Sequence, residues 1–208
     1  VYRRIREEYG FPVYILDSDR LCENYRLLTA GMSAGYAPYR AAYSYKTNYT
    51  PRIVSLVHTL GGMAEVVSGM EYALARRVGN APENILFNGP CKGADGIAAL
   101  LEGACVVIDN EEELAAVVRS AAAHPERVCH TALRLHVDIG SGKPSRFGLR
   151  TEPEYLQKIV SRLRAGENLS FDGIQCHISG SRSIAGWESR ARVMLAPGSP
   201  SRQCCGCR

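Results

Sequence analysis

A chain of 208 residues is long enough to bury a substantial core in one or two domains. Hydrophobic residues make up 46% of it and charged residues 22%, as in ordinary soluble globular proteins. The formal net charge of +4 comes without a basic run interleaved with aromatic residues, which argues against a nucleic-acid partner. No stretch approaches the roughly 18 apolar residues of a membrane helix, and no signal peptide follows the charged start. We therefore expect a cytoplasmic protein without a membrane partner, recorded from Val1 as an already trimmed chain.

The eight cysteines divide into two groups. Five are scattered singly, which is typical of reduced intracellular thiols: Cys22, Cys91, Cys105, Cys129 and Cys176. The other three crowd into the last five residues, where no histidine or second cysteine pair stands at ligand spacing. We therefore expect no metal site.

The order of the predicted elements is the most informative feature of the chain. A short helix-like start precedes an expected strand at 11–16 and a helix at 19–29. Strands and helices then alternate. The strands are expected at 39–45, 63–67, 85–87, 106–108, 131–137 and 171–178. The helices are expected at 51–60, 69–78, 94–101, 111–123, 154–163 and 187–195.

Several helix starts carry a local signal. Thr50 precedes Pro51, which places a cap residue before proline at the first helical position. In a capping box, a side chain before the helix and a carboxylate three residues later each satisfy a free backbone N–H. We expect this box or a close relative of it at Ser68–Glu71, Thr151–Glu154 and Asn110–Glu113.

The alternation implies parallel strands joined by right-handed crossovers. Counting from Tyr39 gives six strand–helix units, which fit an open doubly wound sheet or a (β/α)8 barrel without its last two units. No Gly-x-Gly-x-x-Gly follows a strand, so the dinucleotide-binding version has no support. Periodicity alone leaves sheet and barrel open.

The composition changes abruptly at Ala196, where proline, glycine, serine and cysteine replace the periodic pattern. A truncation or a shifted reading frame would produce such a tail. We expect residues 196–208 to be a disordered, non-native tail that follows an N-terminal segment at 1–38 and a partial barrel at 39–195.

Lys46 is the first candidate for chemistry. It follows the apolar strand Ala41–Tyr45 at the carboxyl end, where barrel active sites assemble. A lysine nearly buried by its strand neighbours is driven toward the neutral amine, and only that form attacks an aldehyde to give an imine. The alternative is an ordinary lysine that reaches solvent from a strand end.

The sequence Tyr43-Ser44-Tyr45-Lys46-Thr47-Asn48 resembles the lysine strand of fold-type III pyridoxal-phosphate (PLP) decarboxylases, the diaminopimelate/ornithine/arginine decarboxylase family. Further blocks resemble the family in order and spacing: 62–71, 85–92, Leu133-Arg134-Leu135, Ser145-Arg146-Phe147-Gly148 and 171–178. The resemblance covers residues 11 to 195. It implies an incomplete α/β barrel of the TIM (β/α)8 type that binds PLP, with the C-terminal β domain missing.

The resemblance also implies roles for individual residues. Lys46 is expected to hold PLP covalently, and His177 to stack on the cofactor ring. Glu65, where the family usually has aspartate, and Arg134 are expected near the lysine. The phosphate is expected at Ser179, Gly180 and Ser181, where the family has a Gly-Ser pair in a different order. Glu71 fits the site and the capping box equally well.

The family's remaining motifs do not occur in this chain: the glycine-rich phosphate loop, the Glu-Pro-Gly-Arg segment and the dimer partner's substrate residues. We therefore expect a homodimeric parent enzyme, similar to diaminopimelate decarboxylase, that decarboxylates a small-molecule amino acid of the basic or diamino class. The 208-residue chain is expected to be inactive by itself. The alternatives are a relative of alanine racemase, a single-domain PLP-homeostasis barrel, and a non-catalytic remnant. The substrate itself stays undetermined.

Overall fold

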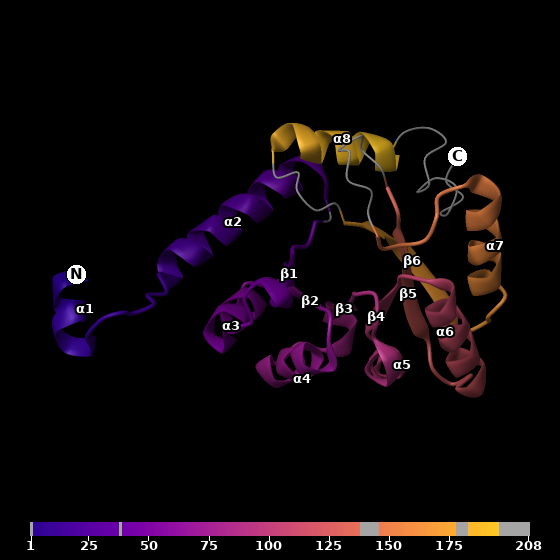
Figure 1. Ribbon diagram of the computed structural model, residues 1–208, viewed down its shortest axis with the longest axis horizontal. Coiled ribbons are helices and arrows are strands. Elements are labelled where there is room, and N and C mark those ends of the chain that lie inside the picture. The colour runs from indigo at the N-terminus through magenta and orange to yellow at the C-terminus, as the bar shows by residue number, and fades with distance from the viewer. Residues whose placement is uncertain (1, 38, 138–145, 178–182, 196–208) are drawn as a thin grey trace.

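The computed structural model describes residues 2–37, 39–137, 146–177 and 183–195. The predicted alternation of strands and helices is confirmed (Figure 1). The α-helices are α1 (Tyr2–Tyr9), α2 (Ser18–Gly35), α3 (Pro51–Thr59), α4 (Gly69–Val78), α5 (Gly93–Glu102), α6 (Glu111–Ala123), α7 (Pro153–Arg164) and α8 (Ile184–Leu195). The strands are β1 (Ala42–Ser44), β2 (Met63–Val66), β3 (Ile85–Phe87), β4 (Cys105–Ile108), β5 (Cys129–Leu135) and β6 (Leu169–Cys176).

The six strands form one parallel sheet and pair in the order in which they occur along the chain. A doubly wound sheet reverses its strand order partway, so the open-sheet alternative is wrong. In Figure 1 the helices from α3 to α7 form an outer arc around the curved row of strands. The described residues therefore form an incomplete barrel, with six strands where a closed (β/α)8 barrel has eight.

An apolar core fills the space between the strands and the outer helices. Val66, Phe87 and Ile108 on the strands and Leu114 and Leu156 on the helices have no exposed surface. Burying an aliphatic or aromatic side chain of this kind contributes about 1.5–3 kcal/mol. This layer fixes the strands from outside, so the inner face of the sheet is left for other side chains.

Polar residues occupy the inner face near the carboxyl ends of the strands. Alternate side chains of a strand point to opposite faces, so Glu65 lies on the face opposite its buried neighbours Ala64 and Val66. Ser44 is the register partner of Glu65, and it therefore shares the same face. The alternation thus separates the apolar layer from a polar one.

The expected strand at 11–16 is wrong. The structure has no strand there, and Phe11 and Tyr14 are 84% and 105% exposed. An extended segment becomes a strand only when a neighbour accepts and donates its backbone hydrogen bonds, and no described residue does so here. Helix α2 is longer than the expected 19–29, because Gly31 lowers helix propensity without ending the helix, which runs on to Gly35.

The expected cap side chains are confirmed at the starts of α4 and α6, where each carboxylate bonds the residue before the cap. The backbone N–H of Glu71 donates to Ser68 Oγ at 3.3 Å, and that of Glu113 donates to Asn110 Oδ1 at 2.9 Å. The box at Thr151 is wrong, because Pro153 takes the first helical position and makes Glu152 the cap, without a side-chain bond. Thr50 does precede the helix at Pro51, but it makes no side-chain cap bond either.

The division of the chain at residues 38 and 39 stays a prediction, and the expected tail from Ala196 lies outside the described residues. No helix in the described part of the chain is both long enough and apolar enough to cross a membrane.

Candidate active site at the carboxyl ends of the strands

Each of the six strands carries a polar residue at or just after its carboxyl end. Because the strands are parallel, these ends meet at one rim of the barrel, which is where barrel enzymes place their active sites. We call these residues the rim cluster: Lys46, Glu65, Asn88, Asp109, Arg134 and His177.

Lys46 lies in a one-turn 3-10 helix, Tyr45–Thr47, directly after β1, and its side chain is exposed. The expected near-burial is wrong, because this turn carries the side chain past the strand neighbours that would have covered it. Tyr45 is only 2% exposed, and its hydroxyl accepts a hydrogen bond from Asn80 Nδ2 at 3.3 Å. A hollow of about 330 Å³ lies beside Lys46 and is lined by residues 46–51. The buried tyrosine thus anchors a turn that presents the lysine amine to open space.

Glu65 is held by a residue of the next strand end. Asn88 Nδ2 donates to Glu65 Oε1 at 3.1 Å, while Asn88 Oδ1 accepts the backbone N–H of Gly89 at 2.8 Å. Asn88 is 5% exposed, so its amide has few other orientations available. The carboxylate of Glu65 is therefore fixed in direction at the rim.

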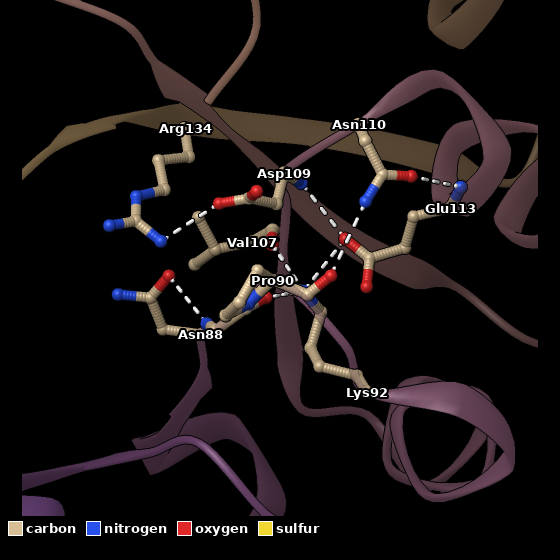
Figure 2. Close-up of polar contacts among 9 residues, drawn as sticks. Asn88, Pro90, Lys92, Val107, Asp109, Asn110, Glu113 and Arg134 are labelled. Carbon is tan, nitrogen blue, oxygen red and sulfur yellow. Dashed lines mark hydrogen bonds and ion pairs between the residues drawn. The ribbon is translucent and has the colours of Figure 1, made fainter. Parts of the chain in front are cut away.

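Arg134 is a buried cation paired with a buried anion. Its NH1 nitrogen donates to Asp109 Oδ1 at 2.8 Å, and both side chains are 6% exposed (Figure 2). The guanidinium carbon lies 4.9 Å from the centre of the Phe147 ring, within the range of a cation–π contact. A buried charge must be paired to be tolerated, so Asp109 is required wherever Arg134 is kept.

His177 follows β6, and burial and neighbouring charged side chains shift the pKa of its imidazole. Partial burial lowers the pKa of its imidazole, and the positive charges of Lys46, Arg134 and Arg190 lower that pKa further. Only the carboxylate of Glu65 acts in the opposite direction. The predicted site residues Lys46, Glu65, Arg134 and His177 are therefore close enough to interact electrostatically.

The lowered pKa predicts how His177 responds to pH. The unfolded chain binds the proton at a higher pH than the folded protein, so the contribution of this residue to stability is present above pH ~6.5 and is lost as the pH falls below it. An NMR titration of the ring is expected to give a pKa below about 6.5. Lys46→Ala is expected to move that pKa upward, because a nearby positive charge is removed. An unchanged pKa in Lys46→Ala would mean that the two side chains do not interact.

Three buried polar atoms near the rim have no hydrogen-bond partner among the described residues: Ser44 Oγ, Arg134 Nε and Gln175 Oε1. Ser44 is paired with Glu65 in the sheet register, and Gln175 is paired with Arg134. Buried polar groups without a partner are uncommon and costly in folded proteins. One hydroxyl, one N–H donor and one carbonyl acceptor therefore fit a polar ligand at this end of the barrel.

A tight turn places Phe147 under Arg134. Leu149 forms a bridge to β5: its N–H donates to Arg134 O at 2.8 Å, and its C=O accepts from His136 N at 2.8 Å. Gly148 adopts a φ of +96°, and a Cβ added there would lie 2.9 Å from the backbone of Leu135 and His136. The turn therefore requires glycine for two separate reasons.

Gly148→Ala is expected to destabilise the protein by about 1–3 kcal/mol, since it adds a backbone clash to a strained φ. Gly61→Ala is the matched control, because Gly61 has a φ of +82° with open space around its Cβ position. Urea unfolding of both variants separates the clash from the dihedral strain. Equal losses in the two variants would show that the close approach at Gly148 has no energetic effect.

Two kinds of residue escaped the sequence analysis. Asn88 and Asp109 were not expected in the site, although each directly follows a strand and that position is itself a signal. Gln175 carried no such signal, because its importance depends on its register with Arg134. The expected phosphate residues Ser179, Gly180 and Ser181 lie outside the described residues. Glu71 serves the helix start, since Glu71 Oε2 accepts the N–H of Val67 at 2.9 Å.

Residues 25–193 match the pyridoxal binding domain of the pyridoxal-dependent decarboxylases. The chain belongs to this family. The match covers most of the chain, and it includes every residue of the rim cluster. The incomplete barrel is thus the pyridoxal-binding barrel of a PLP-dependent decarboxylase family.

The relatives of this decarboxylase-family chain are much longer than the chain itself. Diaminopimelate decarboxylase of Aquifex aeolicus is 26% identical over 192 residues, which are 85% of this chain and 43% of that protein. The L-glutamyl-[BtrI acyl-carrier protein] decarboxylase of Niallia circulans is 26% identical, over 83% of this chain and 41% of that protein. The crystal structure of diaminopimelate decarboxylase from M. jannaschii with L-lysine superposes with a TM-score of 0.81 at 25% identity, over 91% of this chain and 47% of that one. The chain spans less than half the length of these relatives.

Proposed function

We propose that this chain binds PLP through Lys46 and forms the cofactor-binding part of an amino-acid decarboxylase. The observation that carries the proposal is the convergence of Lys46, Glu65, Arg134 and His177 at one rim of the barrel. Membership of the pyridoxal-dependent decarboxylases supports the choice of cofactor. The unpartnered polar atoms beside this cluster fit a small polar group such as PLP.

Each rim residue would contribute differently to holding the cofactor. Lys46 Nζ would form the covalent bond to the PLP aldehyde, because it extends from the turn into open space. His177, whose lowered pKa favours the neutral ring at neutral pH, would offer a flat face for stacking. Glu65 and Arg134 would orient the polar atoms around the bond, and each is already held in place by a hydrogen bond. The phosphate would lie toward Ser179, Gly180 and Ser181.

When bound, PLP supplies an electron sink for the pair left at the substrate Cα as the carboxylate departs as CO2. The chain's own residues would bind and orient the cofactor and would move protons. Lys46 would hold the cofactor through its side-chain amine. Arg134 would keep a fixed positive charge at the rim, and Glu65 a fixed negative one.

For the substrate we propose a diamino acid such as diaminopimelate. Several relatives over most of the chain are diaminopimelate decarboxylases, and the solved relative holds L-lysine, which is also a diamino acid. We further propose a homodimeric parent enzyme in the cytoplasm that acts on a small-molecule amino acid. These statements concern a full-length enzyme such as these relatives, and the chain covers less than half of their length.

The test uses the PLP-loaded 208-residue chain in deuterated water with two amino acids, meso-diaminopimelate and L-alanine. A change in the visible PLP absorption with diaminopimelate, without deuterium entering the Cα of alanine, is the expected result. Deuterium exchange in alanine without release of CO2 would overturn the proposal in favour of a racemase-like protein. Release of CO2 from diaminopimelate would confirm the reaction class and would contradict the expected inactivity of the chain by itself.

A further inference from the structure

Lys92 is a buried lysine whose ammonium group is fully engaged. It directly precedes α5, and its side chain is 1% exposed. Its Nζ donates to Gly89 O at 2.6 Å, to Val107 O at 2.8 Å and to Glu113 Oε2 at 2.7 Å. An ammonium has three N–H donors, so this geometry uses all of them. Lys92 is therefore no second candidate for binding an aldehyde. Its function must depend on the groups that it bonds, above all the carboxylate of Glu113.

Glu113 passes this constraint to the end of β4. The same Oε2 atom that binds Lys92 also accepts the backbone N–H of Asp109 at 2.8 Å. The side chain of Asn110 closes the turn, because its Oδ1 accepts from Glu113 N and its Nδ2 donates to Pro90 O at 3.3 Å. Figure 2 shows these side chains converging on the turn between β4 and α6. The backbone of Asp109 is thereby fixed.

Asp109 completes the connection to the site, because its carboxylate accepts the NH1 of Arg134 at 2.8 Å. We propose that Lys92 is a positioning residue that holds Arg134 at the rim through Glu113 and Asp109. This role rests on the proposed function, in which Arg134 contacts bound PLP. We call Lys92, Glu113, Asp109 and Arg134 the relay.

The geometry around Lys92 has costs that a role in stability alone does not explain. Burial lowers the pKa of Lys92 and thus opposes its charged form, whereas the carboxylate of Glu113 favours that form. A buried ion pair often adds no stability over apolar residues of the same size. The stem of Lys92 also requires Gly96, where an added Cβ would lie 2.6 Å from Lys92 Cβ. These costs are explained if the charge fixes the direction of Asp109 and hence of Arg134.

The test is a double-mutant cycle on the full chain with Lys92→Met, Arg134→Met and the double variant. Methionine keeps a stem of similar length without charge, and Lys158→Met on the exposed face of α7 is the control. Glu113→Gln is the milder alternative if Lys92→Met does not fold, because it keeps the shape of the link. Two quantities are measured for each variant. The first is the free energy of unfolding in urea without PLP, and the second is the PLP dissociation constant from absorbance.

Lys92→Met is expected to weaken PLP binding by about tenfold or more, but by less than about twofold when Arg134 is already methionine. A loss of equal size in both backgrounds would overturn the proposal, because Lys92 would then act independently of Arg134. The unfolding cycle is expected to be non-additive by about threefold or more in the equilibrium constant. If the wild-type chain bound no PLP, the proposed function would fail, and the relay would still stand or fall on this unfolding cycle. An additive unfolding result would overturn the relay in either case.

Discussion

Lys46→Ala is expected to abolish covalent PLP binding completely while the fold persists. The side chain is exposed and lies in a turn anchored by the buried Tyr45, so its loss removes the amine without opening the core. No other described lysine offers a free amine at the rim: Lys92 has all its donors bound, and Lys158 lies on α7. Mass spectrometry after borohydride reduction, which makes the bond to PLP permanent, measures the effect.

The matched control is Lys158→Ala, which removes an exposed lysine on α7 that does not belong to the rim cluster. It is expected to keep full PLP incorporation. Circular dichroism of both variants checks that the helices remain. If Lys46→Ala still carried one PLP per chain, the cofactor would be bound elsewhere and the proposed site would be wrong.

Asp109→Ala is expected to reduce the free energy of unfolding by about 3–5 kcal/mol, which is the usual cost of leaving one member of a buried ion pair unpaired. The guanidinium of Arg134 would lose its NH1 partner while remaining 6% exposed, and its Nε already has no partner among the described residues. The same variant is expected to weaken PLP binding, because Arg134 would no longer be held. Urea unfolding and a PLP titration measure the two effects.

Glu167→Ala is a suitable control for Asp109→Ala, because Glu167 is an exposed carboxylate outside the rim. It is expected to change the unfolding free energy by less than about 0.5 kcal/mol. Adding Arg134→Met to Asp109→Ala should recover part of the lost stability, since the unpaired charge is removed. A loss in Asp109→Ala no larger than in Glu167→Ala would mean that the ion pair does not form as described.

The sequence predicted most of the barrel because its local signals agreed with each other. Helices α4 and α6 match their expected ranges, since each begins at a side-chain cap that fixes its first turn. The segment 11–16 shows the limit of such reasoning. Its apolar, β-branched pattern suits a strand, but a strand needs a partner, and the presence of a partner is a property of the whole fold.

The site was predicted unevenly for a similar reason. Lys46, Glu65, Arg134 and His177 were expected from a resemblance, and their mutual proximity follows from parallel strands that end at one rim. The exposure of Lys46 depended on a turn after β1 that the strand pattern did not predict. The relay was equally hidden, because its contacts link residues from separate strand–helix units, and capping alone already explained Glu113.

The most direct test of the central claim is to identify the lysine that binds PLP in the wild-type chain. The chain has four lysines, so reconstitution with PLP, borohydride reduction and peptide mapping give an unambiguous assignment. A single label on Lys46 is expected. A label on Lys92, a scatter over the remaining lysines, or no label at all would contradict it.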